Sequence, residues 1–230
     1  MKTIGLLGGM SWESTALYYR LINEGVKAAL GGLHSAKIAM VSVDFEAVEK
    51  LQHRQAWDRA GDLLADAARK VEAAGADLLL ICTNTMHKVA PQVADAIAIP
   101  LLHIADATAQ AVRRRGFTRI GLLGTHFTME EDFYKGRLEA QHGLEVIVPP
   151  TADRQAVHRI IYDELCLGNV SPASRAEYLR IMDAMRAAGA EGIIEGCTEI
   201  VMLVDQTHTD IPLFDTTAIH AAAAVEAALE

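Results

Sequence analysis

Residues 193–200 have the sequence Ile-Ile-Glu-Gly-Cys-Thr-Glu-Ile, in which an apolar run stops at a glycine and is followed by Cys197. This pattern is typical of a buried parallel strand that ends where a helix begins. Backbone N–H groups and the helix dipole favour a thiolate at such a place. We therefore expect Cys197 to have a lowered pKa and to be reactive.

Three short motifs occur twice along the chain, in the same order. Ile-Gly-Leu-Leu-Gly occurs at 4–8 and 120–124, Ala-Gly-Ala at 74–76 and 188–190, and Ile-Pro-Leu at 99–101 and 211–213. The three offsets, 116, 114 and 112 residues, are nearly constant. Chance gives one such match but hardly three, so we infer an ancient duplication that produced two similar halves.

Apolar runs alternate with helical patterns along the chain. In the first half, strands are expected at 2–7, 37–43, 77–81 and 100–103, and helices at 13–30, 46–55, 57–74, 87–96 and 106–115. This alternation predicts a parallel sheet with helices on both faces. We expect an α/β fold of two similar lobes related by a pseudo-twofold axis, with the active site in the cleft between them. The first lobe is expected to span 1–98, joined by the C-terminal segment 211–230, and the second lobe 99–210.

Composition and charge restrict the class of function. The net charge of -9 and the lack of a basic run argue against nucleic acid or a membrane surface as partner. No apolar run is long enough to span a membrane, and no signal peptide is recognised, so a cytoplasmic protein is expected. The cysteines and histidines show no metal-ligand spacing, and the Gly-x-Gly-x-x-Gly pattern is absent. We therefore expect neither a metal nor a dinucleotide. An odd number of cysteines suits a reducing compartment; they are Cys82, Cys166 and Cys197.

The repeat assigns a counterpart to Cys197 in the first half. With the middle offset of 114 residues, Cys197 falls on Thr83, and Gly196 falls on Cys82. The two loops follow equivalent strands, so one would offer a thiol and the other a hydroxyl to a shared ligand. Because successive strand side chains point to opposite faces, Cys82 is expected to be a structural residue that points away from the cleft.

Four segments together resemble the aspartate/glutamate racemase family. They are Gly-Gly-Met-Ser-Trp-Glu-Ser at 8–14, Asn-Thr-Met-His at 84–87, Gly-Thr at 124–125 and Gly-Cys-Thr-Glu at 196–199. The resemblance implies two α/β lobes, a homodimer and racemisation without pyridoxal phosphate or another cofactor. The family pattern has a cysteine immediately before Asn84, and this chain has Thr83 there.

Racemisation of an α-amino acid requires two acid/base groups that flank the α-carbon. We predict that Cys197 and Thr83 are this catalytic pair, acting on aspartate, glutamate or both. An alcohol is a far weaker base than a thiolate, so Thr83 is expected mainly to return a proton, directly or through water. By resemblance, Cys197 attacks the L-enantiomer, which is then the favoured substrate.

Polar groups of the strand-end loops are candidates for substrate binding. Groups of the right type for the α-carboxylate and its developing charge are Met10, Ser11, Asn84, Thr85, Thr125 and Thr198. Glu199 is the first candidate and Glu164 the second for the α-ammonium group. Gln52 is the candidate for the side-chain carboxylate.

Simpler interpretations and other functions stay open at this stage. Cys197 could be a small buried hydrophobic residue, residues 83–85 could cap a helix, and Glu199 could balance a helix dipole. His87 and His103 are expected to be core or loop histidines. Two other functions are an arylmalonate-decarboxylase-like enzyme, which would release carbon dioxide from a malonate, and an amino-acid-binding protein that binds without exchanging the α-hydrogen.

Overall fold

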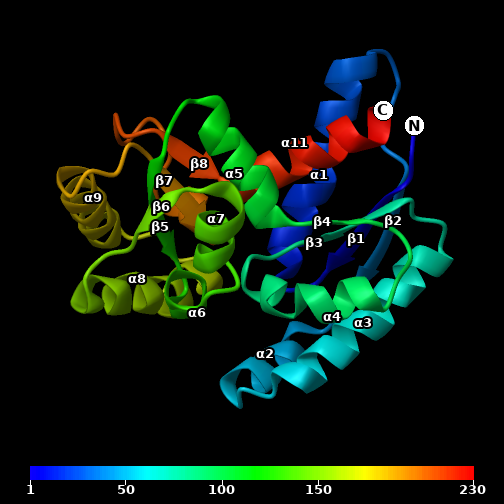
Figure 1. The fold of residues 1–230 in the computed structure, drawn as a ribbon, viewed down its shortest axis with the longest axis horizontal. Helices are drawn as coiled ribbons and strands as arrows, with labels where there is room; N and C mark the ends of the chain where they lie inside the picture. The colour runs from blue at the N-terminus through cyan, green and yellow to red at the C-terminus, as the bar shows by residue number, and fades with distance from the viewer. The chain divides into compact units, whose positions relative to one another are not determined.

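The computed structural model describes residues 1–230 and divides into two compact units. The first unit is Met1–Ile104 with Thr217–Glu230, and the second is Ala105–Thr216. Each unit contains one four-stranded parallel sheet flanked by helices (Figure 1), as the sequence predicts. None of the helices is both long enough and apolar enough to cross a membrane.

The sheet of the first unit has the strand order β2-β1-β3-β4. Its strands are β1 (Ile4–Gly8), β2 (Ile38–Ser42), β3 (Leu78–Ile81) and β4 (Leu101–Leu102). The helices of this unit are α1 (Trp12–Leu30), α2 (Phe45–His53), α3 (Trp57–Ala73), the 3-10 helix η1 (Thr85–Val89), α4 (Ala90–Asp95) and α11 (Thr216–Leu229).

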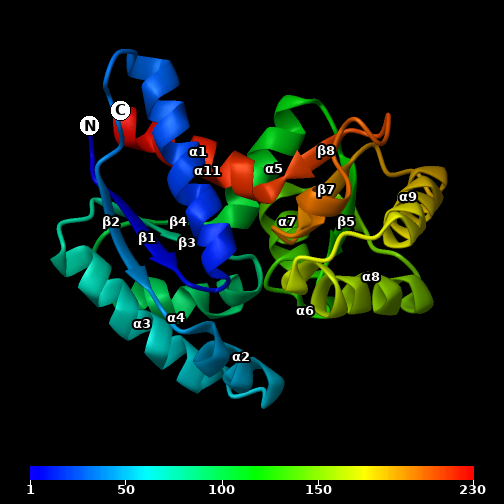
Figure 2. The ribbon, with the colours of Figure 1, turned by 180° about the vertical axis from the view of Figure 1, so that it is seen from behind.

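The two faces of this sheet carry two separate apolar clusters because strand side chains alternate. On one face Leu6 and Leu80 pack with α1 and α11, and on the other Leu7 and Ile81 pack with α2, α3 and α4. Figures 1 and 2 show α1 and α11 on one side of the sheet and α3 and α4 on the other. Both central strands are buried throughout, as expected for a parallel sheet covered on both faces.

The sheet of the second unit has the equivalent order β6-β5-β7-β8. Its strands are β5 (Arg119–Gly124), β6 (Glu145–Ile147), β7 (Ile193–Gly196) and β8 (Leu213–Asp215). The helices of this unit are α5 (Ile104–Arg114), α6 (His126–Glu130), α7 (Lys135–His142), α8 (Thr151–Asp163), the 3-10 helix η2 (Leu165–Leu167), α9 (Pro172–Ala187) and α10 (Ile200–Leu203).

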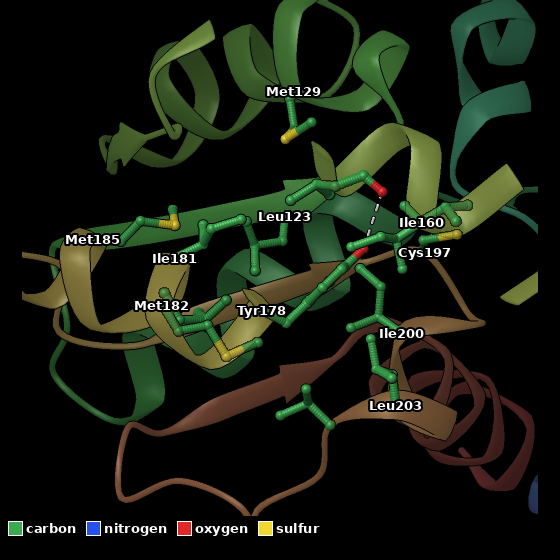
Figure 3. Packing of buried hydrophobic residues seen from close by; sticks show 14 of the residues in the cluster. Leu123, Met129, Ile160, Tyr178, Ile181, Met182, Met185, Cys197, Ile200 and Leu203 are labelled. Carbon is green, nitrogen blue, oxygen red and sulfur yellow. Dashed lines mark hydrogen bonds between the residues drawn. The ribbon is translucent and has the colours of Figure 1, made fainter. Parts of the chain in front are cut away.

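The principal core of the second unit lies between one face of its sheet and helices α8 and α9. Figure 3 shows Leu123 of β5 with Ile160 of α8 and Ile181 of α9, and Cys197 beside them. The hydroxyl of Tyr178 donates a hydrogen bond of 3.2 Å to the backbone oxygen of Val157, which ties α9 to α8. The first residue of the loop after β7, Cys197, therefore packs against the apolar core of the second unit.

The strand registers of the two sheets repeat each other. In the first sheet Leu79 pairs with Gly5 and Leu101, and in the second sheet Ile193 pairs with Gly121 and Leu213. These partners are related by the same offsets of 116, 114 and 112 residues as the repeated motifs. Strand pairing thus supports the duplication inferred from the sequence. It also places Thr83 and Cys197 at equivalent positions, each two residues beyond a paired residue: Ile81 pairs with Leu7, and Glu195 pairs with Leu123.

The unit boundaries differ from the expected ones at 98/99 and 210/211. β4 pairs with β3, so residues 99–104 belong to the first unit. β8 pairs with β7, so residues 211–216 belong to the second unit. Strand pairing decides both boundaries, and the apolar pattern used for the expectation contains no pairing information.

The helix expected at 87–96 is also divided, into η1 and α4. Pro91 lies in the first turn of α4. Proline has no backbone N–H and favours the beginning of a helix over its interior. The chain therefore forms a short 3-10 turn before α4 begins.

Gly9, at the exit of β1, has a backbone angle φ of +93°, and a Cβ atom there would overlap the backbone of Val43. We expect Gly9→Ala to lower the free energy of unfolding by about 3 kcal/mol or more, since strain and overlap add. The matched control is Gly143→Ala at the end of α7. There φ is +65°, and a Cβ atom added to Gly143 would meet no other atom within 4 Å. This control should cost only about 1–2 kcal/mol. If urea denaturation shows that both variants lose the same free energy of unfolding, the close packing of the Gly9 loop is contradicted.

Candidate active site

The loop after β3 carries Thr83, which is half-buried, directly after the fully buried Cys82. Cys82 lies in the apolar cluster with Leu80 and Tyr18. Burial raises the pKa of the Cys82 thiol far above its usual value, so it stays protonated and unreactive. The prediction that Cys82 is a buried structural residue is confirmed.

Asn84 and Thr85, which follow Thr83, are buried. η1 begins at Thr85, but the side chain of Asn84 makes no capping hydrogen bond to it. The interpretation of Asn84 as a helix cap is therefore not supported. Both side chains have the donor and acceptor groups that a carboxylate-binding loop needs.

The loop after β1, with Met10 and Ser11, is fixed to the exit of β3. Ser11 is the N-cap of α1, and its Oγ accepts a hydrogen bond of 3.3 Å from the backbone nitrogen of Ser14. Ser14 Oγ in turn donates to the backbone oxygen of Cys82 at 3.0 Å. Met10 is buried in the cluster that includes Met86. The structure thus brings the predicted binding residues of the β1 loop next to those of the β3 loop.

Gln52 is buried on α2, and its Nε2 lies 2.9 Å from the sulfur atom of Met86. Met86 is three residues beyond Thr83, in the 3-10 helix η1 that follows the loop. The fold therefore brings Gln52 to the β3 loop, although α2 and this loop are far apart in the sequence. A thioether is a weak acceptor, so the Gln52 amide can exchange it for a carboxylate at little cost.

The loop after β7 carries Cys197, Thr198 and Glu199. The Cys197 thiol donates a hydrogen bond of 2.9 Å to Oε2 of Glu199, and the Thr198 hydroxyl donates one of 2.8 Å to the same oxygen. Cys197 is buried, with 8% of its surface exposed. The predicted catalytic thiol is therefore paired with a carboxylate of its own loop.

The expectation that a helix N-terminus lowers the pKa of Cys197 is wrong. Burial, and then the charge and hydrogen bond of the Glu199 carboxylate, raise the pKa of the thiol well above its usual value. The backbone N–H of Glu199 lowers it, as expected, but less strongly. The following helix α10 has only four residues, so its dipole is small. Cys197 is consequently a thiol until its proton is accepted by another group.

Thr125 and Glu164, two predicted binding residues of the second unit, are engaged within that unit. Thr125 follows β5 and caps α6, where its Oγ1 accepts from the backbone nitrogen of Thr128 at 3.4 Å. Glu164 ends α8 and accepts a hydrogen bond of 2.5 Å from Ser174 of α9. Burial, and then the charges of Cys197 and Glu164, raise the pKa of Tyr178. Glu164 and Cys197 are thus electrostatic neighbours of one tyrosine.

Two residues near these loops were not predicted to matter, His87 and Glu195. Glu195 is buried in β7, two residues before Cys197, and its Oε1 has no hydrogen-bond partner. Burial, and then the charges of Asp215 and Asp205, raise the pKa of Glu195 to about 8. A glutamate inside an otherwise apolar strand was the available signal. For His87 the signal was its place in Asn-Thr-Met-His, directly after the Thr83 loop.

No group of three or more histidine, cysteine, aspartate or glutamate side chains is arranged to hold a metal ion. The loop of Thr83 also carries amide and hydroxyl groups, and the loop of Cys197 also carries hydroxyl and carboxylate groups. Such groups transfer protons and bind the charged ends of a small molecule.

Comparison with known proteins agrees with this chemistry. A family model described as Asp/Glu/Hydantoin racemase matches residues 7–224. The chain is 56% identical to a candidate Asp/Glu racemase from Yersinia pestis, with a TM-score of 0.95 and 100% of both chains covered. It is 34% identical to an aspartate racemase homologue from Pyrococcus horikoshii OT3, with a TM-score of 0.87 and the same coverage. It is also 24% identical, over 94% of this chain and 93% of the relative, to the broad specificity amino-acid racemase RacX from Bacillus subtilis (strain 168).

Proposed function

Because the chain belongs to the Asp/Glu/hydantoin racemase family, we propose that it racemises aspartate, glutamate or both without pyridoxal phosphate or another cofactor. The observation that carries this proposal is the strand register, which makes Cys197 the counterpart of Thr83. Two acid/base groups of this kind can serve the two faces of one α-carbon. A cytoplasmic location and a homodimer are further parts of the proposal.

The first proposed step activates Cys197. The thiol proton moves along the 2.9 Å hydrogen bond to Oε2 of Glu199, which leaves a thiolate. The thiolate then removes the α-hydrogen of the L-enantiomer as a proton. An S–H bond forms, and the electron pair of the broken C–H bond remains on the substrate as an enediolate. Glu199 is the proton acceptor in this scheme, which leaves Glu164 as the stronger candidate for the α-ammonium group.

The second proposed step returns a proton to the opposite face. The Thr83 hydroxyl delivers its proton to the α-carbon, directly or through water, and recovers one from solvent. In the reverse direction Thr83 must act as the base, which an alcohol does poorly. The two free enantiomers are equally stable, so kcat/KM for racemisation is the same from either one. The preference for the L-enantiomer therefore concerns formation of the enediolate by Cys197, before Thr83 completes racemisation.

Substrate binding is assigned to the surrounding polar groups. We propose that the α-carboxylate and the enediolate charge are bound by donors of the loops after β1, β3, β5 and β7, namely Met10, Ser11, Asn84, Thr85, Thr125 and Thr198. The contact of Gln52 with Met86 supports its role toward the side-chain carboxylate, because it lies beside the Thr83 loop.

A panel of D- and L-amino acids, followed by chiral chromatography, tests this function. We expect aspartate or glutamate to be converted to its enantiomer, and no carbon dioxide to be released from an arylmalonate. Carbon dioxide release would favour the decarboxylase alternative. Tight binding of an amino acid without α-hydrogen exchange would favour a binding protein.

Thr83→Cys is expected to raise the racemisation rate about 100-fold, the low end of what a positioned acid or base contributes. A thiol at Thr83 exchanges protons more readily than an alcohol, and the Thr83 step limits racemisation in this account. The control is Cys82→Ala, which removes the neighbouring buried thiol and should leave the racemisation rate within a few-fold of wild type. An unchanged or lower rate in a folded Thr83→Cys protein would mean that Thr83 does not limit the reaction.

A further inference from the structure

His87 links the loop that carries Thr83 to the first residue of α5 through the two nitrogens of its ring. Nδ1 lies 2.8 Å from the backbone oxygen of Thr83, and Nε2 lies 3.2 Å from the backbone nitrogen of Ile104. A backbone N–H only donates, so Nε2 is the acceptor and carries no proton. Nδ1 therefore carries the ring proton and donates it to Thr83.

The surroundings of His87 keep this neutral form. Its ring is 1% exposed and lies edge-on to His103 and His220, with ring centroids 4.5 Å and 5.8 Å away. His220 is itself fixed, because its ring nitrogens lie 2.8 Å from the hydroxyl of Tyr18 and 2.9 Å from the backbone oxygen of Leu102. Burial, and then His103 and His220, hold the pKa of His87 well below its usual value.

The two partners of the His87 ring belong to different segments. Thr83 is in the loop after β3, whereas Ile104 is the first residue of α5, whose first backbone N–H has no acceptor within the helix. The backbone N–H of His87 also donates to the backbone oxygen of Asn84 at 3.0 Å. His87 thus holds two successive carbonyl groups, those of Thr83 and Asn84, which fixes the backbone that carries the Thr83 side chain.

We propose that His87 is a positioning residue that sets the Thr83 hydroxyl for proton delivery to the substrate α-carbon. This rests on the proposed racemase function. An acid group that is misplaced by about 1 Å can lose about 100-fold in rate. Because His87 acts through Thr83, its loss slows the step that Thr83 performs and leaves deprotonation by Cys197 unchanged.

Two variants separate the contacts of the ring. An asparagine N–H can take the place of Nδ1, and a glutamine carbonyl can take the place of Nε2. We expect His87→Gln to lower racemisation about 10- to 100-fold, with deuterium exchange into recovered L-substrate near the wild-type rate. His87→Asn keeps the donor toward Thr83, so it should racemise the substrate faster than His87→Gln does. The ratio of racemisation to exchange, measured in one sample, does not depend on how much of the protein is folded.

An unchanged ratio in His87→Gln would overturn this inference, because it would show a purely structural role. In a Thr83→Ala background, His87→Gln should cause no further loss of the residual racemisation, since there is no hydroxyl to position. A further loss of the same size would also overturn the inference. A wild-type protein with neither exchange nor racemisation would overturn the racemase function as well, so the two failures are distinguishable.

Discussion

Cys197→Ala is expected to reduce racemisation of aspartate or glutamate about 1000-fold or more, because it removes the proposed base for formation of the enediolate. The Glu199 carboxylate remains, but it is placed to accept the thiol proton. Chiral chromatography of the reaction mixture measures the loss. The substitution removes a single sulfur atom from the apolar cluster shown in Figure 3, so the protein should still fold.

The control for this variant is Cys166→Ala. Cys166 is an exposed cysteine on η2 that forms no disulfide, so its loss tests whether removal of any thiol affects the reaction. We expect it to keep wild-type activity. If Cys197→Ala keeps racemisation within about tenfold of wild type, Cys197 is not the base, and the proposed mechanism is wrong.

Glu195→Gln is expected to raise the free energy of unfolding at pH 8 by about 2–4 kcal/mol. The pKa of Glu195 is about 8 in the folded chain, against 4.5 in the absence of its surroundings. One pKa unit corresponds to about 1.4 kcal/mol, and the buried amide of glutamine keeps part of the desolvation cost. The folded protein holds this proton more tightly than the unfolded chain does. The contribution of Glu195 to the free energy of unfolding of the wild type is therefore lost as the pH rises from about 4.5 to about 8.

Urea denaturation at pH 5 and pH 8 measures this effect. The free energy of unfolding of Glu195→Gln should exceed that of the wild type only slightly at pH 5 and by the largest amount at pH 8. The control is Glu191→Gln, because Glu191 is exposed and accepts hydrogen bonds from the backbone N–H groups of Arg119 and Thr118, which lower its pKa. The contribution of Glu191 to the free energy of unfolding is present at both pH values. Glu191→Gln should therefore lower that free energy equally at pH 5 and pH 8. Equal free energies of unfolding for Glu195→Gln and wild type at pH 8 would contradict a buried carboxyl group in β7 whose Oε1 has no hydrogen-bond partner.

The fold could be predicted largely from the sequence because two independent patterns agreed. Alternating strands and helices indicated parallel sheets, and the repeated motifs supplied offsets that the strand registers reproduce. The place of Cys82 followed from the alternation of strand side chains alone. The unit boundaries did not follow, because they depend on which strands pair.

The chemical state of the candidate site was harder to predict than its residues. Cys197 was identified from its place after a strand, but the direction of its pKa shift depends on burial and on Glu199 Oε2. Sequence spacing gives neither the orientation of a carboxylate nor the length of the following helix. The sequence likewise predicts His87 only as a core or loop histidine, because its contact with Thr83 depends on the local turn and its contact with Ile104 depends on the tertiary fold.

The central claim, that Cys197 and Thr83 serve the α-carbon unequally, is tested most directly by hydrogen exchange in heavy water. L- and D-aspartate, or L- and D-glutamate, are incubated separately with the wild-type protein, and α-deuterium is measured in the recovered starting enantiomer. We predict that recovered L-substrate gains deuterium faster than it racemises, because Cys197 removes the α-hydrogen, its thiol exchanges that hydrogen for solvent deuterium, and the deuteron is returned before Thr83 acts. Recovered D-substrate should gain little. Equal labelling of the two recovered enantiomers would contradict the account.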